Sequence, residues 1–589
     1  MTVKETTEKT RFARAASVAD VQKAGCTAVH VNGHTIALFA HGDKIYAVDN
    51  RCPHMGFPLD RGTVKDGILT CHWHHARFDL ETGGTFDQFA DDVRAFPLEI
   101  RDGEVWVDVV SRHDQRQHQQ ERLQVGLERD LSLVIGKAVL VLLDDGGDPV
   151  APFRTGLEFG ARYRQAGWGQ GLTMLTCFVN MLPHLDAADR SRALYQGLSA
   201  VAVDTAGSPP RFPVRPLPDS TTDIATLKRW FRSFIEVRDD EGAERCIISA
   251  IRAGADDKQM ADMLFAAVTD HRYIQVGHPA DFTNKAFEAL DVAGWEHAEP
   301  VLASLVSGYA GAARMEESNA WRNPIDLIAI LDAAFDQLAP ALANGRQARQ
   351  RNGQGWNGND DLIPVLLGDE PQATADALLA ALATGATEVE LAGAVSYAAA
   401  LRIARFHTSN EFGDWDTALH TFTFANAVEQ GLRRAPSVEL LRGVFDAAMS
   451  IYLDRFLNIP AARIPQPNGR VDNPANLLEQ LPALLDRQQQ VNQAGELVGR
   501  YLYSGGAPEP LLALLGSLLL REDRDFHTIQ TVEAAFNQYR LLRGTEAGAH
   551  ALIAAARYLA AHSPTVRAQG QTYQIAYRLH RGDRLFEEA

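Results

Sequence analysis

The stretch NRCPHMGFPLDRGTVKDGILTCHWHHARF, from Asn50 to Phe78, contains two cysteine–histidine pairs. A single proline separates Cys52 from His54, and two residues separate Cys71 from His74. Sixteen residues lie between the two pairs. Prolines and a glycine surround the first pair, which predicts that the pairs lie in loops at strand ends. Two thiolates and two imidazoles can bind a metal, so these four residues are candidate ligands.

The order of the ligands bears on which metal they bind. A structural zinc site also takes two cysteines and two histidines in a tetrahedron. Zinc fingers, however, place both cysteines before both histidines and carry the histidines on a helix, whereas here the types alternate in a β context. Alternation favours a 2Fe-2S cluster in which one iron takes both thiolates and the other both imidazoles. Zinc remains the alternative interpretation.

Because of these four residues and their spacing, the segment of about 10–110 resembles a Rieske domain. The pattern of that family is C-x-H, about sixteen residues, then C-x-x-H. CHWHHARFDLETGG, starting at Cys71, resembles the second-loop signature of that family, although His75 and Ala76 stand where it commonly has His-Gly. Respiratory members carry a further cysteine in each loop. Here the corresponding positions hold Phe57 and Trp73 or its neighbours, and none of them is a cysteine. The resemblance is therefore to the ferredoxin and oxygenase type.

This resemblance implies a small antiparallel β domain that holds a 2Fe-2S cluster. The implied ligands are Cys52, His54, Cys71 and His74. Electrons would be exchanged through the exposed edges of the two histidines. Alternating apolar and polar residues support the β domain, as do turn signals at Asn32-Gly33, Gly42-Asp43 and Asp102-Gly103.

The bulk composition excludes several classes of protein. The chain has 589 residues, 46% of them apolar, and a net charge of −18, which argues against binding nucleic acid phosphates or anionic membranes. At about 150 residues per domain, it has room for about four folding units. The longest apolar run, Leu131–Leu143, is too short to span a bilayer and contains Lys137. An N-terminus without an apolar core and five scattered cysteines indicate a cytoplasmic protein.

The composition and the hydrophobic periodicity of the sequence change after the β domain. We predict a Rieske-type domain over 1–110, a polar linker over 111–125, and an α-helical region over 126–589. Alanine and leucine recur at helical spacing throughout this last region. The predicted fold class is therefore an all-β domain followed by a large all-α domain of pseudo-repeated helix pairs.

Three segments of the helical region resemble one another, near 254–330, 385–460 and 506–580. Each begins with Gly-Ala, continues as an apolar helix, and reaches a histidine after 24, 22 or 21 residues. These histidines are His278, His407 and His527. Equivalent positions of repeated helical units tend to face a common axis, so we expect the three side chains to converge.

Carboxylates near these histidines suggest a second iron site. His407 and Glu411 share a helix face if one helix spans both, and helical proteins build iron sites from such pairs. We therefore predict that His278, His407, Glu411 and His527 bind iron. In a metal-free site, His407 or His420 would instead act as the catalytic base. The structural alternative is that these side chains only cap helices.

The helical region also resembles the questin-oxidase-like family. The resemblance lies in DFHTIQTVEAAFNQY, from Asp525, and HTFTFANAV, from His420, where a histidine opens a helix and is followed by a hydroxyl. It implies oxidation of an aromatic, polyketide-like substrate. The histidine–aspartate spacing of ordinary Rieske oxygenases is not found in this region.

Together these features predict an oxidoreductase in which the cluster passes electrons to the helical site for oxygen-dependent oxidation of a small organic molecule. Flavin and nicotinamide fingerprints were not found, so the electron donor would be a separate reductase or ferredoxin. The resemblance to oxygenases implies a homo-oligomer. The competing hypothesis is an electron carrier or redox sensor whose helical region is a non-catalytic docking scaffold.

Overall fold

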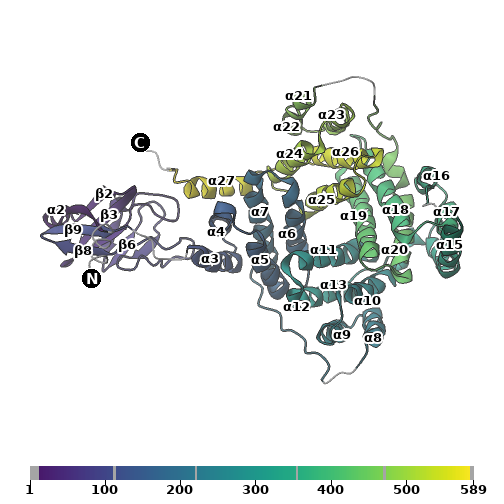
Figure 1. Cartoon of the computed structure of the whole chain (residues 1–589), viewed down its shortest axis with the longest axis horizontal. Coiled ribbons are helices and arrows are strands. Elements are labelled where there is room, and N and C mark those ends of the chain that lie inside the picture. The colour runs from purple at the N-terminus through teal and green to yellow at the C-terminus, as the bar shows by residue number, and fades with distance from the viewer. Residues whose placement is uncertain are drawn as a thin grey trace. The chain divides into compact units, whose positions relative to one another are not determined.

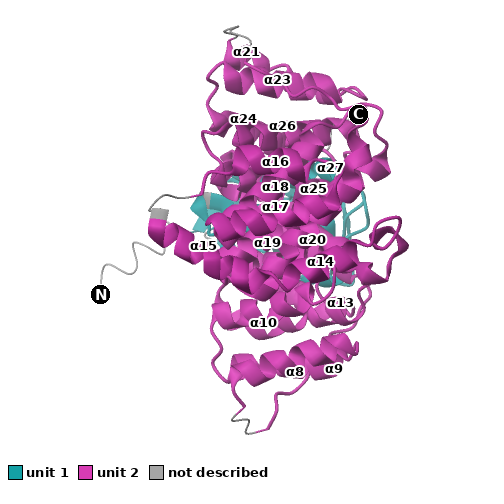
Figure 2. Ribbon diagram, turned by 90° about the vertical axis from the view of Figure 1, so that its right-hand side faces the viewer, with its two compact units in different colours: residues 1–152, 569–589 teal, residues 153–568 magenta. Residues whose placement is uncertain are grey.

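A computed structural model describes residues 12–109, 115–218, 222–352, 356–467, 473–583 and 585. The chain divides into two compact units, one made of 1–152 with 569–589 and the other of 153–568 (Figure 2). The boundary differs from the predicted one at 126, because the first long helices after the strands belong with the β domain. Of the predicted linker 111–125, residues 111–114 lie outside the described residues, and helix starts at Gln115.

Three antiparallel sheets build the first unit. Their hydrogen-bonded orders are β1 (Phe12–Ser17), β9 (Glu104–Asp108), β8 (Leu98–Arg101); β2 (Cys26–Val31), β3 (His34–His41), β4 (Lys44–Asp49); and β5 (Thr63–Lys65), β6 (Ile68–Thr70), β7 (Arg77–Asp79). Asn32-Gly33, Asp66-Gly67 and Asp102-Gly103 join neighbouring strands with positive φ at both positions. Such turns match the twist of paired strands, which is why Asn-Gly and Asp-Gly occur there.

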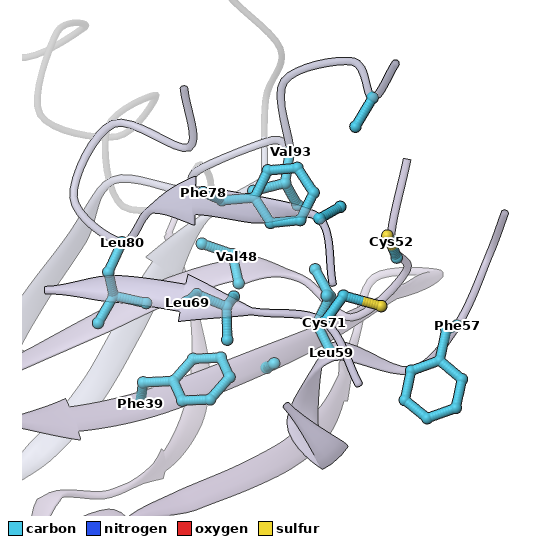
Figure 3. Packing of buried hydrophobic residues seen from close by; sticks show 13 residues of the cluster. Phe39, Val48, Cys52, Phe57, Leu59, Leu69, Cys71, Phe78, Leu80 and Val93 are labelled. Carbon is cyan, nitrogen blue, oxygen red and sulfur yellow. The ribbon is translucent and has the colours of Figure 1, made fainter. Parts of the chain in front are cut away.

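Strand β3 is buried on both faces and separates two cores. Ile36 and Leu38 pack into one core with residues of β9, whereas Ala37 and Phe39 pack into the other. This second core contains Cys52 and Cys71, and Figure 3 shows both sulfurs at one end of the packed group. The β domain thus anchors both cysteine loops on one rigid apolar base.

Helices complete the first unit. They are α2 (Val18–Ala24), α3 (Gln115–Arg129), α4 (Ser132–Leu143) and α27 (Ala568–His580). Helices α3 and α4 pack closely as a hairpin, and a Cβ atom on Gly126 would lie only 2.8 Å from Cγ1 of Ile135. A larger side chain at position 126 would therefore push the two helices apart.

The second unit is helical, which confirms the predicted fold class. Four of its helices contact one another in a ring, in the order α6 (Gln170–Met181), α11 (His278–Ala293), α19 (Phe412–Arg434) and α25 (Phe526–Leu541) (Figure 1). The other long helices of the unit are α5 (Val150–Tyr163), α7 (Ala187–Thr205), α8 (Ile224–Glu236), α9 (Asp240–Arg252), α10 (Asp257–Thr269), α15 (Leu338–Asn352), α17 (Pro371–Thr384), α18 (Glu388–Ala404), α20 (Val438–Leu453), α23 (Val491–Tyr503), α24 (Pro508–Leu520) and α26 (Glu546–Ala561). Shorter helices are α12 (Ala298–Ala303), α13 (Val306–Ala310), α14 (Leu327–Phe335), α16 (Asn359–Leu366), α21 (Pro474–Leu478) and α22 (Leu481–Leu485).

The three similar sequence segments correspond to helix pairs: α10 with α11, α18 with α19, and α24 with α25. The second helix of each pair belongs to the four-helix ring. Side-chain caps start several of these helices, among them the capping boxes at Asp256 and Thr387 and the cap at Asp525. The caps satisfy N–H groups that have no partner within the helix.

Among the described helices, none by itself combines the length and apolar character that crossing a bilayer requires. The bent pair of α14 and α15 has the required length and composition only when the two helices are taken together.

Candidate metal centres

The two cysteine loops have the same backbone design. Cys52 N–H donates to the carbonyl of Phe57 at 2.8 Å, and Gly56 N–H donates back to Cys52. In the second loop, Cys71 N–H donates to the carbonyl of Ala76 at 2.9 Å, and His75 N–H donates back to Cys71. The matched pattern closes each loop around its cysteine.

The fourth residue after each cysteine adopts a left-handed conformation. It is Gly56 in the first loop, with φ +82°, and His75 in the second, with φ +61°. Glycine adopts this region without a steric penalty, whereas a side chain makes it less favourable. In the second loop the left-handed position is therefore occupied by His75, a residue with a side chain, where the first loop has glycine.

The two thiols lie against each other at the end of the apolar core. Cys52 shares a hydrogen bond with the sulfur of Cys71, and the main-chain N–H groups of Trp73 and His74 point to the same sulfur. These hydrogen bonds lower the pKa of Cys71 to about 6, against the opposing effect of burial. The same hydrogen bond, together with burial, raises the pKa of Cys52, so the pair favours the thiolate form at Cys71. The thiolate is the form that binds metals.

The two imidazoles lie next to each other. The ring centroids of His54 and His74 are 4.9 Å apart, and the ring planes are nearly perpendicular. His54 is half-buried and His74 is exposed. Burial lowers the pKa of His54 to about 4, with smaller effects from Lys137 and His74, so its ring is neutral. Within the described part of the chain, the buried Nδ1 atom of His54 has no hydrogen-bond partner.

These four side chains fit a 2Fe-2S cluster. Adjacent thiols, one with a lowered pKa, can supply two thiolates to one iron, and adjacent neutral rings can supply two nitrogens to the other. The unsatisfied Nδ1 atom of His54 would gain a partner in such a cluster. Where respiratory members carry a disulfide, the rings of Phe57 and Trp73 pack 6.1 Å apart.

A second set of ligands lies in the helical unit. One ligand atom from each of His278, His420 and His527 lies within 4.8 Å of the other two. The Nε2 atoms of His420 and His527 are 3.1 Å apart. Two nitrogens bound to one metal at about 2.1 Å each are separated by about 3 Å, so this spacing suits a shared ion. We call these three residues the histidine triad.

Asp416 contacts two members of the triad. Its Oδ1 atom lies 3.2 Å from Nδ1 of His527, and its main-chain carbonyl accepts a hydrogen bond from the ring of His420. Within the described residues, Oδ1 of Asp416 lies close to His527 without forming a hydrogen bond. The hydrogen bond to His420 is of the kind that fixes the tautomer of a metal-binding histidine and leaves its other nitrogen free for the metal. The spacing of Asp416 and His420, four residues apart on one helix, is the sequence signal for this contact.

Aromatic rings border the triad on one side. The ring of His278 lies 5.3 Å from that of Phe282 and 5.6 Å from that of Phe526. Phe526 also packs on His527, with 4.0 Å between centroids. The triad therefore has an apolar, aromatic border formed by Phe282 and Phe526.

The structure brings together His278 and His527, both predicted as iron ligands, with His420, predicted as a catalytic base. His407 and Glu411 are not members of this group. Helix α18 ends at Ala404 and α19 begins at Phe412, so no helix spans both residues. Nδ1 of His407 accepts a hydrogen bond from Ser409, and Glu411 caps α19.

A buried group of charges lies along α11, beyond the triad. Nζ of Lys285 donates to Oε2 of Glu533 at 2.6 Å and to Oε2 of Glu288 at 2.9 Å. One turn closer to His278, the side chain of Asp281 accepts a hydrogen bond from Gln530. Burial raises the pKa of Asp281 to about 7. Glu288 and Glu533 also line a cavity of about 670 Å³.

Comparisons with known proteins agree with the geometry of the first centre. The family model described as "Rieske [2Fe-2S] domain" matches residues 11–97. The "Anthranilate 1,2-dioxygenase ferredoxin subunit" of Burkholderia cepacia is 36% identical over 75 residues, which are 13% of this chain and 69% of the relative. The ferredoxin component of the "Naphthalene 1,2-dioxygenase/salicylate 5-hydroxylase systems" of Ralstonia sp is 32% identical over 87 residues, 15% of this chain and 84% of the relative.

Among solved structures, the "Ferredoxin of carbazole 1,9a-dioxygenase from Nocardioides aromaticivorans IC177" is 28% identical, with a TM-score of 0.16. The match covers 16% of this chain and 95% of that ferredoxin. Each of these three relatives is thus similar to less than a fifth of the chain.

Proposed function

Since this chain belongs to the Rieske [2Fe-2S] domain family through residues 11–97, we propose that it is an oxidoreductase with a second metal site in its helical unit. Its N-terminal domain is homologous to ferredoxin components of oxygenase systems and functions in electron transfer. In the proposed reaction, these electrons serve the oxygen-dependent oxidation of an organic substrate at the histidine triad.

The observation that carries this proposal is the meeting of three imidazoles from three different helices. His278 opens α11, His527 lies at the start of α25, and His420 lies two turns into α19. Burial is the leading cause that lowers the pKa of all three rings, to about 3 for His278 and about 4 for His420. All three are therefore neutral at pH 7, as metal ligands must be.

Each residue around the triad has a distinct role in this proposal. His278, His420 and His527 would hold the iron, and Asp416 would orient His420 through its main-chain carbonyl. An iron with few protein ligands keeps open positions for dioxygen chemistry when it is bound. Phe282 and Phe526 would bind the substrate by apolar contact. This suits an aromatic substrate, which the resemblance to the questin-oxidase-like family also implies.

The remaining participants are proposed from the family. An external reductase or ferredoxin would reduce the cluster, with exposed His74 as the contact point. We propose a cytoplasmic protein that functions as a homo-oligomer with an unidentified small-molecule substrate.

Metal analysis of the purified full-length chain tests the proposal. We expect about three iron atoms and two acid-labile sulfides per chain, since the cluster accounts for two of the irons. The chemically reduced protein should consume oxygen when a suitable substrate is present. Two irons per chain, even after anaerobic loading with ferrous iron, would remove the second site. A scaffold for docking would then be the better interpretation of the helical unit.

A further inference from the structure

Helix α4 of the first unit is apolar except for one charged residue. Its buried positions include Val134, Ile135, Ala138 and Val139. Lys137 lies between them, where a charge is costly unless it is hydrogen-bonded. The sequence alone does not explain a lysine in this position. The contacts of its ammonium group in the structure explain it.

The ammonium of Lys137 binds the first cysteine loop. Nζ donates to the carbonyl of Pro53 at 2.5 Å and to the carbonyl of His54 at 2.6 Å. These carbonyls belong to the residue between Cys52 and His54 and to His54 itself. In the described part of the chain, both hydrogen-bond partners of this ammonium are main-chain oxygens of the loop. Its charge therefore lies beside two of the four cluster ligands.

The nearby carboxylate of Asp91 attracts this charge from a distance but forms its hydrogen bonds with other residues. Asp91 accepts hydrogen bonds from Nε2 of His118 at 2.7 Å and from Nε2 of Gln119 at 2.8 Å, and Arg122 lies 3.4 Å away. Helix α3 therefore supplies the partners of Asp91. Among the described residues, Lys137 forms no ion pair with a carboxylate within 4.0 Å.

We propose that Lys137 is a positioning residue of the 2Fe-2S cluster, which holds the His54 loop and raises the reduction potential of the cluster by its charge. Reduction adds one electron, and hence one negative charge, to the cluster. A fixed positive charge close to a partly desolvated site favours that state. The helical hairpin after the β domain is therefore part of the redox centre.

The inference rests on the cluster ligands alone and not on the histidine triad. The test compares full-length Lys137→Met, Lys137→Gln and Lys137→Arg with Lys44→Met, a control at the exposed first residue of β4. Iron and sulfide content and the spin-resonance spectrum report on the cluster, and redox titration gives its potential. Because none of these readouts involves the triad, a failure here is distinguishable from a failure of the proposed oxygenase activity.

We expect Lys137→Met and Lys137→Gln to retain the cluster at a more negative potential. A tenfold drop in the equilibrium constant for reduction corresponds to about 59 mV for one electron. Lys137→Arg and Lys44→Met should remain close to the unchanged protein. Loss of the cluster in Lys137→Met and Lys137→Gln, but not in Lys137→Arg, would also support the positioning role. Equal potentials in all variants, or an arginine variant as impaired as the methionine variant, would overturn the inference.

Discussion

The Nε2 atoms of His420 and His527 lie 3.1 Å apart, although 107 positions separate the two residues along the chain. The main-chain carbonyl of Asp416 accepts a hydrogen bond from the ring of His420, and its Oδ1 atom lies 3.2 Å from Nδ1 of His527, on the side away from His420. The ring of His278 completes the group, with its centroid 4.7 Å from that of His420. Three neutral rings placed in this way form a candidate metal site that no single stretch of sequence contains.

Replacing His420 with Ala should remove the iron of the triad and spare the cluster. Two rings bind iron more weakly than three, so we expect total iron to fall from about three to about two per chain while sulfide stays constant. His407→Ala is the matched control, because His407 lies in a loop outside the triad. Equal iron loss in both variants would contradict the assignment.

Exchange of one cluster ligand should change the potential in a known direction. In His74→Cys, a thiolate replaces a neutral imidazole and adds negative charge to the cluster. All-cysteine clusters have lower potentials than clusters with two histidines, so we expect a more negative midpoint with the iron retained. Redox titration followed by visible absorption measures it. Unchanged redox behaviour would show that His74 is not a ligand.

The metal-free protein should lose stability on mild acidification. The unfolded chain protonates these histidines near pH 6.5, whereas burial lowers the folded-state pKa of His278 to about 3 and of His420 to about 4. Between about pH 6.5 and 4 the unfolded state therefore binds more protons, and stability falls as the pH falls. Urea unfolding at pH 7 and pH 5 measures this dependence.

The double variant His278→Gln/His420→Gln serves as the control for this pH effect. It should show a weaker loss between the two pH values, because two of the titrating rings are absent. A pH dependence as steep as that of the unaltered protein would locate the effect elsewhere.

Removal of the buried lysine should destabilise the helical unit strongly. Lys285→Met leaves Glu288 and Glu533 without their shared cation, and breaking a buried pair in this way costs about 3–5 kcal/mol. Chemical denaturation measures the change. Lys258→Met, at an exposed position, should change the free energy of unfolding by less than about 0.5 kcal/mol. A double variant Lys285→Met/Glu533→Met should recover part of the loss, whereas full additivity would contradict the coupling.

Local spacing predicted the first centre well. The pairs Cys52/His54 and Cys71/His74 each lie in one short loop, and the loops follow β4 and β6, strands of two different sheets that share one core. Where ligands are close in sequence, turn geometry determines most of their arrangement. The contact of Lys137 could not be predicted this way, because it joins segments 84 residues apart.

The second centre shows where local reasoning fails. The expected pairing of His407 with Glu411 assumed a continuous helix, and the chain is irregular between Ala404 and Phe412. In the second helix pair, the histidine that joins the triad is His420, which lies 13 positions after His407. A helix end that shifts by several residues changes which side chain faces the axis of the ring.

The amino-acid sequence by itself determined the division of the chain into a β region and a helical region, the paired loops of the β domain and the candidate histidines. The signals for these features are turns, alternation and helical periodicity, which act over a few residues. Only the tertiary structure decided which histidines meet and that Asp416 contacts two of them. It also decided that Lys137 of an apolar helix binds the first loop. These contacts depend on how helices far apart in the chain pack on one another, and packing is set by whole apolar faces rather than by local spacing.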